Sequence, residues 1–301
     1  MSDVTYDGRV AVITGAGGGL GRSHALSLAE RGAKIVVNDL GGNTDGTGAG
    51  SSMADIVVKE IVDAGGEAVA NYDSVSTPEG GEAIIQTALD AFGTVDIVIN
   101  NAGILRDKSF AKIPPGDFDI LIDVHLRGAF HVSQPAFRVM KEKGFGRFVH
   151  TTSAAGLFGN FGQANYAAAK TGLVGLSNVI AVEGQKNNIT SNVIAPIAKS
   201  RLLGDLAGPL ADSLQPELVT PLVAYLVSPS CEITHEIFSV GGGRIARVFL
   251  GLGPGWFAGK GNQFTPEDVA ANIDQIRETA DFIIPSSVME ETMALMNALN
   301  S

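Results

Sequence analysis

The chain has 301 residues, of which 45% are hydrophobic and 18% are charged, and 38 of them are glycines. This composition predicts a globular protein with a buried core and excludes a disordered chain. The formal net charge of -11 argues against bulk nucleic-acid binding, which requires clustered positive charge. The length predicts one large domain with an appendage.

Features that report on the cell compartment agree with one another. The single cysteine, Cys231, allows no intrachain disulfide, which fits a reducing compartment. The N-terminal residues lack the basic and apolar regions of a signal peptide, and no apolar run is long enough to span a membrane. The last residues, ALNS, do not form an SKL-type peroxisomal signal. We therefore expect a cytoplasmic protein, which would be peroxisomal only if it were excised from a larger eukaryotic chain.

Short apolar runs alternate with helix-length amphipathic segments along the chain. The runs are rich in β-branched residues and do not alternate strictly, as is typical of strands buried on both faces. The predicted strands are 9–14, 34–39, 67–72, 95–100, 146–152, 189–195 and 236–241, and the predicted helices are 20–31, 52–64, 79–91, 116–142, 164–183 and 216–227. This order predicts an α/β fold, a Rossmann-type doubly wound sheet of seven parallel strands with helices on both faces.

Two segments depart from this alternation. Residues 41–52 form a long Gly/Ser/Thr loop after the second strand. Residues 244–301 follow the last predicted strand, and Thr265 followed by Pro266 and acidic residues predicts a capped helix there. We expect a domain over 1–243 and a helical C-terminal extension over 244–301, which packs on the same domain or on a partner subunit.

The first predicted strand leads directly into a glycine-rich turn and a helix. Gly15, Gly19 and Gly21 follow the pattern TGxxxGxG. Glycines there allow the backbone to approach a pyrophosphate closely, and the helix N-terminus offers free N–H groups. The order of strand, turn and helix therefore predicts a dinucleotide site, with a glycine turn that binds no ligand as the alternative.

Polar residues end the next three strands. Asp39 ends the second strand, where a carboxylate can accept hydrogen bonds from ribose hydroxyls and repel a 2′-phosphate, so it favours NAD over NADP. The alternative is that Asp39 only caps a turn. Asp73 ends the third strand, and Asn101, Ala102 and Gly103 follow the fourth, so we expect them to face the same crevice. Asn100 and Asn101 could equally be structural residues that tie neighbouring loops together.

A serine, a tyrosine and a lysine form the candidate catalytic set. Tyr166 and Lys170 lie one helical turn apart, and Ser153 follows the fifth strand. A nearby ammonium lowers the pKa of a phenol from about 10, so Tyr166 could act as a general base for an alcohol or an acid for a ketone. Ser153 could orient the substrate oxygen. Alone, the Tyr166–Lys170 pair would more simply be a surface pair.

Together these motifs resemble the short-chain dehydrogenase/reductase family. TGAGGGLG, NNAG, Ser153 and YAAAK match that family in order and spacing, over roughly residues 8–243. The resemblance implies NAD(P)-dependent oxidoreduction, a homodimer or homotetramer, and contact of Lys170 with the nicotinamide ribose. No metal site and no nucleic-acid partner are expected.

Further stretches are similar to one subgroup, the (3R)-hydroxyacyl-CoA dehydrogenases. They include NDLGG at 38–42, NNAGILRD at 100–107 and GNFGQANYAAAK at 159–170. The similarity implies NAD-dependent oxidation of (3R)-3-hydroxyacyl-CoA to 3-ketoacyl-CoA, by a free-standing chain or a fragment. A 17β-hydroxysteroid dehydrogenase and a catalytically silent NAD-binding scaffold are the alternatives. The similarity also places on the cofactor Leu20, Asp39, Ser74, Val75, Asn101, Tyr166, Lys170, Ala198, Lys199 and Ser200.

Some positions depart from the family pattern. His125 stands where the family usually has an asparagine, and it is either a proton-relay member or a core histidine held by the backbone. Lys199, Arg201 and Arg244 are candidate contacts for the phosphates of an acyl-CoA, or solvated charges. Residues 200–214 mix apolar residues with Gly and Pro, which predicts a mobile lid over the substrate or an ordinary connection.

Overall fold

The computed structural model describes residues 4–48, 50–198 and 213–300. The chain divides into two compact units, Met1–Arg247 and Val248–Ser301. Within the described residues, no helix is both long and apolar enough to cross a membrane.

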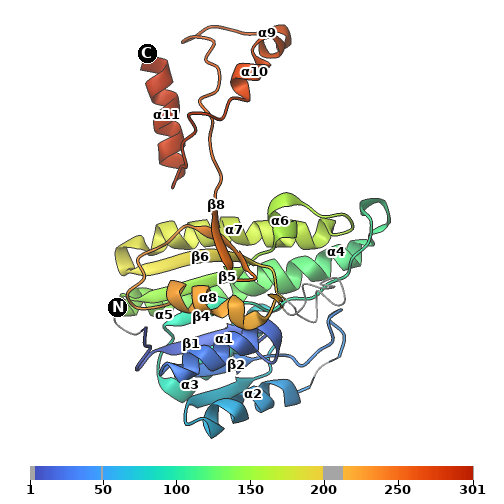
Figure 1. The fold of residues 1–301 in the computed structure, drawn as a ribbon, viewed down its shortest axis with the longest axis vertical. Coiled ribbons are helices and arrows are strands. Elements are labelled where there is room, and N and C mark those ends of the chain that lie inside the picture. Colours follow the sequence, from blue (N-terminus) through green and yellow to red (C-terminus); the bar gives the residue numbers. More distant parts are fainter. Residues whose placement is uncertain (1–3, 49, 199–212, 301) are drawn as a thin grey trace. The chain divides into compact units, whose positions relative to one another are not determined.

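The first unit is built on an eight-stranded sheet with the order β3-β2-β1-β4-β5-β6-β7-β8 (Figure 1). The strands are β1 (Val10–Thr14), β2 (Lys34–Asn38), β3 (Glu67–Asn71), β4 (Ile97–Asn100), β5 (Gly146–Thr151), β6 (Ile189–Pro196), β7 (Ile237–Gly241) and β8 (Arg244–Val248). Strands β1 to β7 pair in parallel, so the predicted doubly wound parallel sheet is confirmed. The strand order reverses at β1, which pairs with both β2 and β4.

The eighth strand is an addition to the seven that the sequence predicts. Gly242 and Gly243 both have positive φ values, 57° and 79°, as a tight two-residue hairpin turn requires. The chain therefore folds back, and β8 lies at the sheet edge beside β7. Arg247 on β8 forms an ion pair with Glu236 at 3.2 Å. β8 joins the sheet, and the first unit ends at Arg247.

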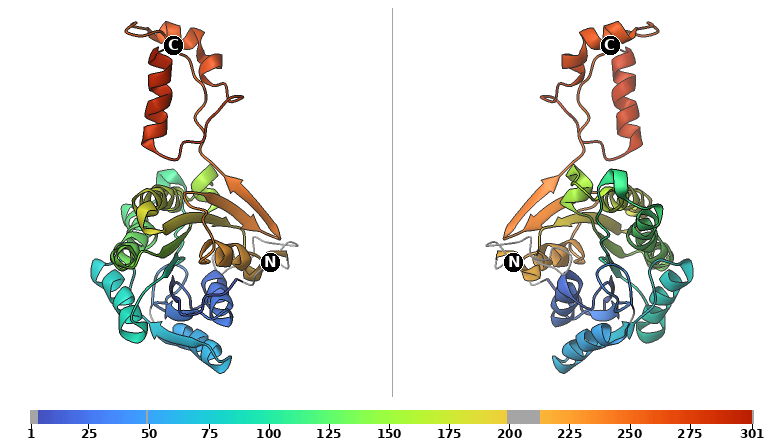
Figure 2. Two further views of the ribbon diagram at one scale, coloured as in Figure 1. Left: turned by 90° about the vertical axis from the view of Figure 1, so that its left-hand side faces the viewer. Right: turned by 90° about the vertical axis from the view of Figure 1, so that its right-hand side faces the viewer.

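Helices cover both faces of the sheet, as the edge-on views of Figure 2 show. One core packs around Leu28, Ala54 and Leu222, and the other around Ile84, Val132 and Ile180. The helices are α1 (Gly19–Glu30), α2 (Ser52–Asp63), α3 (Pro78–Phe92), α4 (Pro115–Leu121), α5 (Gly128–Lys143), α6 (Ala154–Phe158), α7 (Ala164–Gly184) and α8 (Thr220–Leu226), with short helical turns η1 (Phe110–Lys112), η3 (Gln185–Asn187) and η5 (Pro216–Leu218).

The single helix predicted over 116–142 is interrupted. Between α4 and α5 lies a π-helical segment, η2 (Ile122–Arg127), which contains His125. Gly128 follows it, and a Cβ atom there would lie 2.8 Å from Val75 Cγ2, so the helix can approach the neighbouring loop only through glycine. Periodicity alone does not reveal such a π-helical turn, and these turns are frequent at functional sites.

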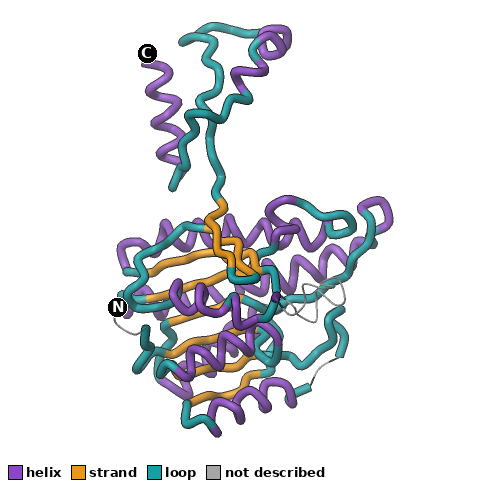
Figure 3. The backbone as a smooth tube through the Cα atoms, in the orientation of Figure 1, coloured by secondary structure: helices purple, strands orange, loops and turns teal. Residues whose placement is uncertain are grey.

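The second unit contains α9 (Pro266–Ala271), α10 (Ile273–Ile276) and α11 (Val288–Asn300), joined by extended loops (Figure 3). The predicted N-cap is confirmed, because Thr265 forms a reciprocal capping box with Asp268. Leu252 and Ile283 exchange backbone hydrogen bonds, and Phe249 stacks on Phe282 with ring centroids 5.2 Å apart. None of the described side chains on the three helices is buried.

Candidate active site

The glycine turn between β1 and α1 brings backbone, not side chains, to the carboxyl edge of the sheet. Gly15 and Gly19 have φ values of 64° and 51°, which only glycine adopts at little cost. A Cβ atom on Gly21 would lie 2.3 Å from the carbonyl oxygen of Gly15, so this position also requires glycine. Leu20 instead points toward the core. A turn without side chains that opens a helix fits the pyrophosphate of a dinucleotide.

Asp39 contacts the glycine turn directly. Its Oδ2 accepts a hydrogen bond from the backbone N–H of Gly17 at 2.8 Å, and its Oδ1 accepts one from Gly41 at 2.7 Å. Asp39 therefore caps its own turn, as the alternative interpretation holds, and also braces the glycine turn. Each carboxylate oxygen keeps a further lone pair, so these bonds are compatible with a ribose contact.

The polar residues after β3 and β4 form internal ties. Asn101 Nδ2 donates to the carbonyl oxygens of Thr14 and Gly15, both at 3.1 Å. Asn100 Nδ2 donates to Ser133 Oγ at 2.9 Å, and Asp73 Oδ2 accepts from Asn71 at 2.7 Å. Both asparagines thus tie neighbouring segments together in the structure.

Further predicted cofactor-binding residues lie beside these hydrogen-bonded side chains. The backbone N–H of Ala102 donates to Thr14 Oγ1 at 3.1 Å, and the hydroxyls of Ser74 and Ser76 are 2.8 Å apart. Val75 is buried, as is Ala198 after β6. Gly103 has no room for a side chain, because a Cβ atom would lie 2.5 Å from His125 Cε1.

Ser153, Tyr166 and Lys170 come together beside this edge. Ser153 follows β5 and caps α6, accepting from the N–H of Ala155 at 3.2 Å. Lys170 is almost fully buried, and its Nζ donates to the carbonyl oxygen of Thr151 at 2.7 Å. The same Nζ lies 5.5 Å from the centroid of the Tyr166 ring.

Burial dominates the acid–base properties of this set. It raises the pKa of Tyr166 above 10, although a hydrogen bond with Ser153 acts in the opposite direction, and the charge of Asp107 adds to the rise. Burial lowers the pKa of Lys170 from 10.5 to about 7. The sequence argument expects a lowered pKa for Tyr166. The structure differs because burial of the phenol raises its pKa by more than the hydrogen bond with Ser153 lowers it.

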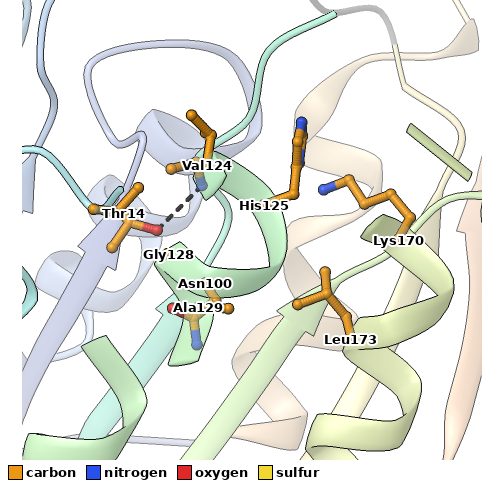
Figure 4. A pocket seen from close by; sticks show the side chains of 10 residues that line it. Thr14, Asn100, Val124, His125, Gly128, Ala129, Lys170 and Leu173 are labelled. Carbon is orange, nitrogen blue, oxygen red and sulfur yellow. Dashed lines mark hydrogen bonds between the residues drawn. The ribbon is translucent and has the colours of Figure 1, made fainter. Parts of the chain in front are cut away.

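His125 is held by backbone groups next to the tyrosine. Its Nε2 lies 2.8 Å from the carbonyl oxygen of Ile104 and 3.1 Å from the nitrogen of that residue. Its ring meets Tyr166 edge to face, and Figure 4 shows Lys170 pointing toward it. Burial, together with the charge of Lys170, lowers the pKa of His125 well below 6.5. Burial therefore favours the neutral form of His125, and its hydrogen-bonding contacts in the structure are with backbone groups.

A small cavity of about 10 Å³ is lined both by Lys170 and His125 and by Thr14, the last residue of β1 (Figure 4). This is close to the smallest space that holds one water molecule. His125 Nδ1 and Asn100 Oδ1 are buried and have no hydrogen-bond partner among the described residues. The cavity is lined by Thr14, Val75, Asn100, Ala102, Val124, His125, Gly128, Ala129, Lys170 and Leu173.

The predicted phosphate-contact residues are not among those described at this site. Lys199, Ser200, Arg201 and most of the expected lid lie outside the described residues. Arg244 is exposed at the start of β8.

Sequence reasoning also missed a residue that positions the tyrosine. The side chain of Asn165 is buried and accepts from the N–H of Tyr166 at 2.8 Å. It also donates to the carbonyl oxygens of Arg106 at 3.0 Å and Asp117 at 2.8 Å. An asparagine in the first turn of a helix with few charges was the available signal.

The fold and this site define an oxidoreductase of the dinucleotide-binding α/β class. The sequence matches the short chain dehydrogenase family over residues 9–200. The chain belongs to the short-chain dehydrogenase/reductase family, whose dehydrogenases typically use a nicotinamide cofactor.

Individual relatives are similar over nearly the whole chain. Peroxisomal multifunctional enzyme type 2 of Mus musculus is 50% identical, over 99% of this chain and 40% of the mouse protein. A short-chain type dehydrogenase/reductase of Mycobacterium tuberculosis is 52% identical, over 90% of this chain and 94% of that protein. The solved structure of full-length peroxisomal multifunctional enzyme type 2 from Drosophila melanogaster is 39% identical with a TM-score of 0.83, over 99% of this chain and 50% of that chain. The chain thus spans less than half of its mouse relative and half of that solved chain.

Proposed function

We propose that this chain catalyses NAD-dependent oxidation of (3R)-3-hydroxyacyl-CoA to 3-ketoacyl-CoA. The observation that carries this proposal is the grouping of Ser153, Tyr166 and Lys170 at the sheet edge that also holds the glycine turn. Relatives named as multifunctional enzymes and as a hydratase-dehydrogenase-epimerase support the substrate class.

The chemistry assigns one role to each side chain. The Tyr166 oxygen accepts the proton of the 3-hydroxyl, while the hydrogen on the same carbon leaves as hydride and the carbonyl bond forms. NAD, when bound, would supply the hydride acceptor. Ser153 donates a hydrogen bond to the substrate oxygen and orients it. Lys170 places its amine next to the phenol ring, and we propose that it also contacts the nicotinamide ribose.

Burial of Tyr166 has a consequence for pH dependence. A raised pKa leaves the phenol protonated near neutral pH, and a base must be deprotonated to accept a proton. Alcohol oxidation should therefore speed up as the pH rises, whereas ketone reduction, which needs the protonated phenol, should not.

We propose NAD rather than NADP on the basis of Asp39. Its carboxylate is almost fully buried and fixed by Gly17 and Gly41, so it cannot turn away from a 2′-phosphate. The carboxylate and a 2′-phosphate beside it would repel each other, because both are negatively charged. The same edge carries the other residues that we propose to contact NAD, namely Gly15, Gly19, Leu20, Gly21, Asp73, Ser74, Val75, Asn101, Ala102, Gly103 and Ala198.

Exposed apolar side chains on the segments around Lys108 and Gln163 would suit an acyl substrate. Phe158 ends α6 and is 72% exposed, Phe161 is 89% exposed, and Phe110 is 83% exposed. Backbone pairing of Lys108 with the Gln163 region brings these segments close together. A free 17β-hydroxysteroid would find the same apolar surface, so it is the second candidate substrate.

The test is the initial rate of NADH formation with a substrate panel. The panel contains (3R)- and (3S)-3-hydroxyacyl-CoAs of short and long chain and 17β-hydroxysteroids, each with NAD and NADP. Turnover of the (3R)-acyl-CoAs with NAD is expected. Turnover of free steroid alone would overturn the substrate, and preference for NADP would overturn the role of Asp39. Silence with every substrate, while NADH still binds, would favour a catalytically silent scaffold.

We also propose a cytoplasmic homodimer or homotetramer, in which the extension packs on its own domain or on a partner subunit. Relatives from mouse and yeast are named as peroxisomal. Analytical sedimentation of the purified chain would test the oligomeric state, and a monomer would contradict it. Fluorescence of a tagged chain in separated cell fractions would test the localisation, and a signal in the peroxisomal fraction would contradict a cytoplasmic one.

A further inference from the structure

The glycine-rich loop after β2 has no role in the chemistry described so far. We call its residues 41–48 the glycine bridge. The bridge reaches the segment that follows β4, where the N–H of Leu105 donates to the carbonyl oxygen of Thr44 at 2.9 Å. Arg106 Nε donates to the carbonyl oxygen of Asp45 at 2.8 Å. Because β1 lies between β2 and β4, the bridge must cross the sheet edge where the glycine turn begins.

The glycine bridge has a defined shape and a close fit. Its own residues are linked by hydrogen bonds from the N–H of Asn43 to Thr47 O at 2.7 Å and from the N–H of Thr47 to Asp45 Oδ1 at 2.9 Å. Gly46 has a φ of 85°, and a Cβ atom there would lie 2.9 Å from Ile104 Cδ1. One end of the bridge is also anchored, because Gly41 donates to Asp39.

Arg106 connects the bridge to the catalytic helix. Its Nη1 donates to Asp117 Oδ1 at 3.1 Å, which fixes the guanidinium while Nε holds the bridge. The carbonyl oxygen of Arg106 accepts a hydrogen bond from the side chain of Asn165. That side chain in turn accepts a hydrogen bond from the backbone N–H of Tyr166. One residue therefore contacts the bridge, α4 and the neighbour of the catalytic tyrosine.

We propose that Arg106 is a positioning residue that latches the glycine bridge over the dinucleotide crevice and ties its closure to the placement of Tyr166. The inference rests on the proposed function only in that the ligand is a dinucleotide. In this proposal, a bound dinucleotide would span the crevice between Asp39 and the catalytic set, beneath the bridge. It therefore leaves quickly only when the bonds to Leu105 and Arg106 are open, and Arg106 controls its rate of dissociation.

Arg106→Gln removes the charge and the Nε donor, and Lys108→Gln is its matched control. Lys108 pairs with the same carboxylate, since its Nζ lies 3.5 Å from Asp117 Oδ2, but its described contacts are not with the bridge. The first measurement is hydrogen–deuterium exchange of the ligand-free protein. In Arg106→Gln the amides of Leu105, Asn43 and Thr47 should exchange about tenfold faster, as expected when one charge-assisted hydrogen bond is lost. In Lys108→Gln they should exchange as in the wild type.

The second measurement is the rate of NADH dissociation by stopped-flow fluorescence. Dissociation should be about tenfold faster in Arg106→Gln and unchanged in Lys108→Gln. If the glutamine variant does not fold, Arg106→Lys takes its place. It keeps the positive charge beside Asp117 but lacks the planar guanidinium, so NADH should again dissociate faster than from the wild type.

Two results would overturn the latch. One is wild-type exchange of the bridge amides in Arg106→Gln, and the other is faster exchange with an unchanged rate of NADH dissociation. A wild-type protein that binds no NADH would instead refute the proposed cofactor, and the exchange data would still show whether Arg106 holds the bridge.

Discussion

The rings of His125 and Tyr166 meet edge to face, with centroids 5.3 Å apart and planes at 90°. His125 is in turn fixed by the backbone of Ile104, so the position of the phenol depends on a residue from the π-helical turn. Positioning by a neutral imidazole is a different role from proton relay, and the two make different predictions.

Replacement of His125 should separate these roles. Asparagine offers both a donor and an acceptor to Ile104, so His125→Asn should retain most of the free energy of unfolding. His125→Leu leaves unpaired the one buried Ile104 group that Nε2 bonds and should lose about 1–3 kcal/mol in urea unfolding. With positioning alone, the pH–rate profile of His125→Asn keeps its wild-type midpoints. A shifted midpoint would support the relay.

Removal of the Tyr166 hydroxyl should abolish most turnover. General acid–base catalysis contributes about 10²–10⁴-fold, so Tyr166→Phe should lower kcat by that order while NADH binding is retained. Tyr72→Phe is the matched control, because Tyr72 is half exposed and its hydroxyl bonds only to Asp55 among the contacts described. Equal kcat values for the two variants would refute the assignment of Tyr166 as the base.

Substitution of Gly21 should weaken dinucleotide binding at the glycine turn. In Gly21→Ala the new Cβ would meet the Gly15 carbonyl oxygen at 2.3 Å, which forces the turn to move. NADH affinity, measured by fluorescence titration, should fall at least about tenfold, because the turn's N–H groups lose their alignment. Gly116→Ala adds the same methyl group to α4, where nothing lies within 4 Å, and should bind NADH normally. Normal binding by both variants would contradict the turn's role.

Two further buried histidines should make the fold sensitive to acid. Burial lowers the pKa of His24 and of His150 from 6.5 to about 3. The unfolded chain therefore binds more protons than the folded one between pH 6.5 and 3, and the free energy of unfolding falls as the pH falls through that window. Above pH 6.5 neither residue contributes to the pH dependence.

The double variant His24→Asn/His150→Asn tests this sign. Asparagine can replace the Nδ1 contacts with Thr220 and Asn100 and does not titrate. Urea unfolding at pH 7 and pH 5 should show a smaller loss of stability in the variant than in the wild type. An identical loss would place the acid sensitivity elsewhere.

Much of the fold was readable from the sequence, because strands buried on both faces are continuous apolar runs and glycines mark the turn after β1. The eighth strand was not, since Arg244 and Arg247 make it look like solvated chain. The π-helical turn was missed because hydrophobic periodicity does not report a local change in the hydrogen-bond pattern of a helix. The grouping of Ser153, Tyr166 and Lys170 followed from their spacing, whereas the pKa direction of Tyr166 depends on burial, which spacing does not report.

The short hairpin strand β8 has a consequence for solubility. Open sheet edges offer unpaired N–H and C=O groups to other chains and promote aggregation. Without β8, that edge would be β7, whose Ile237 and Val240 are buried in the present structure. With β8 in place, the outermost strand is five residues long and carries two arginines. Short, charged edge strands discourage pairing between molecules, so this hairpin acts as a guard against fibre-like self-association.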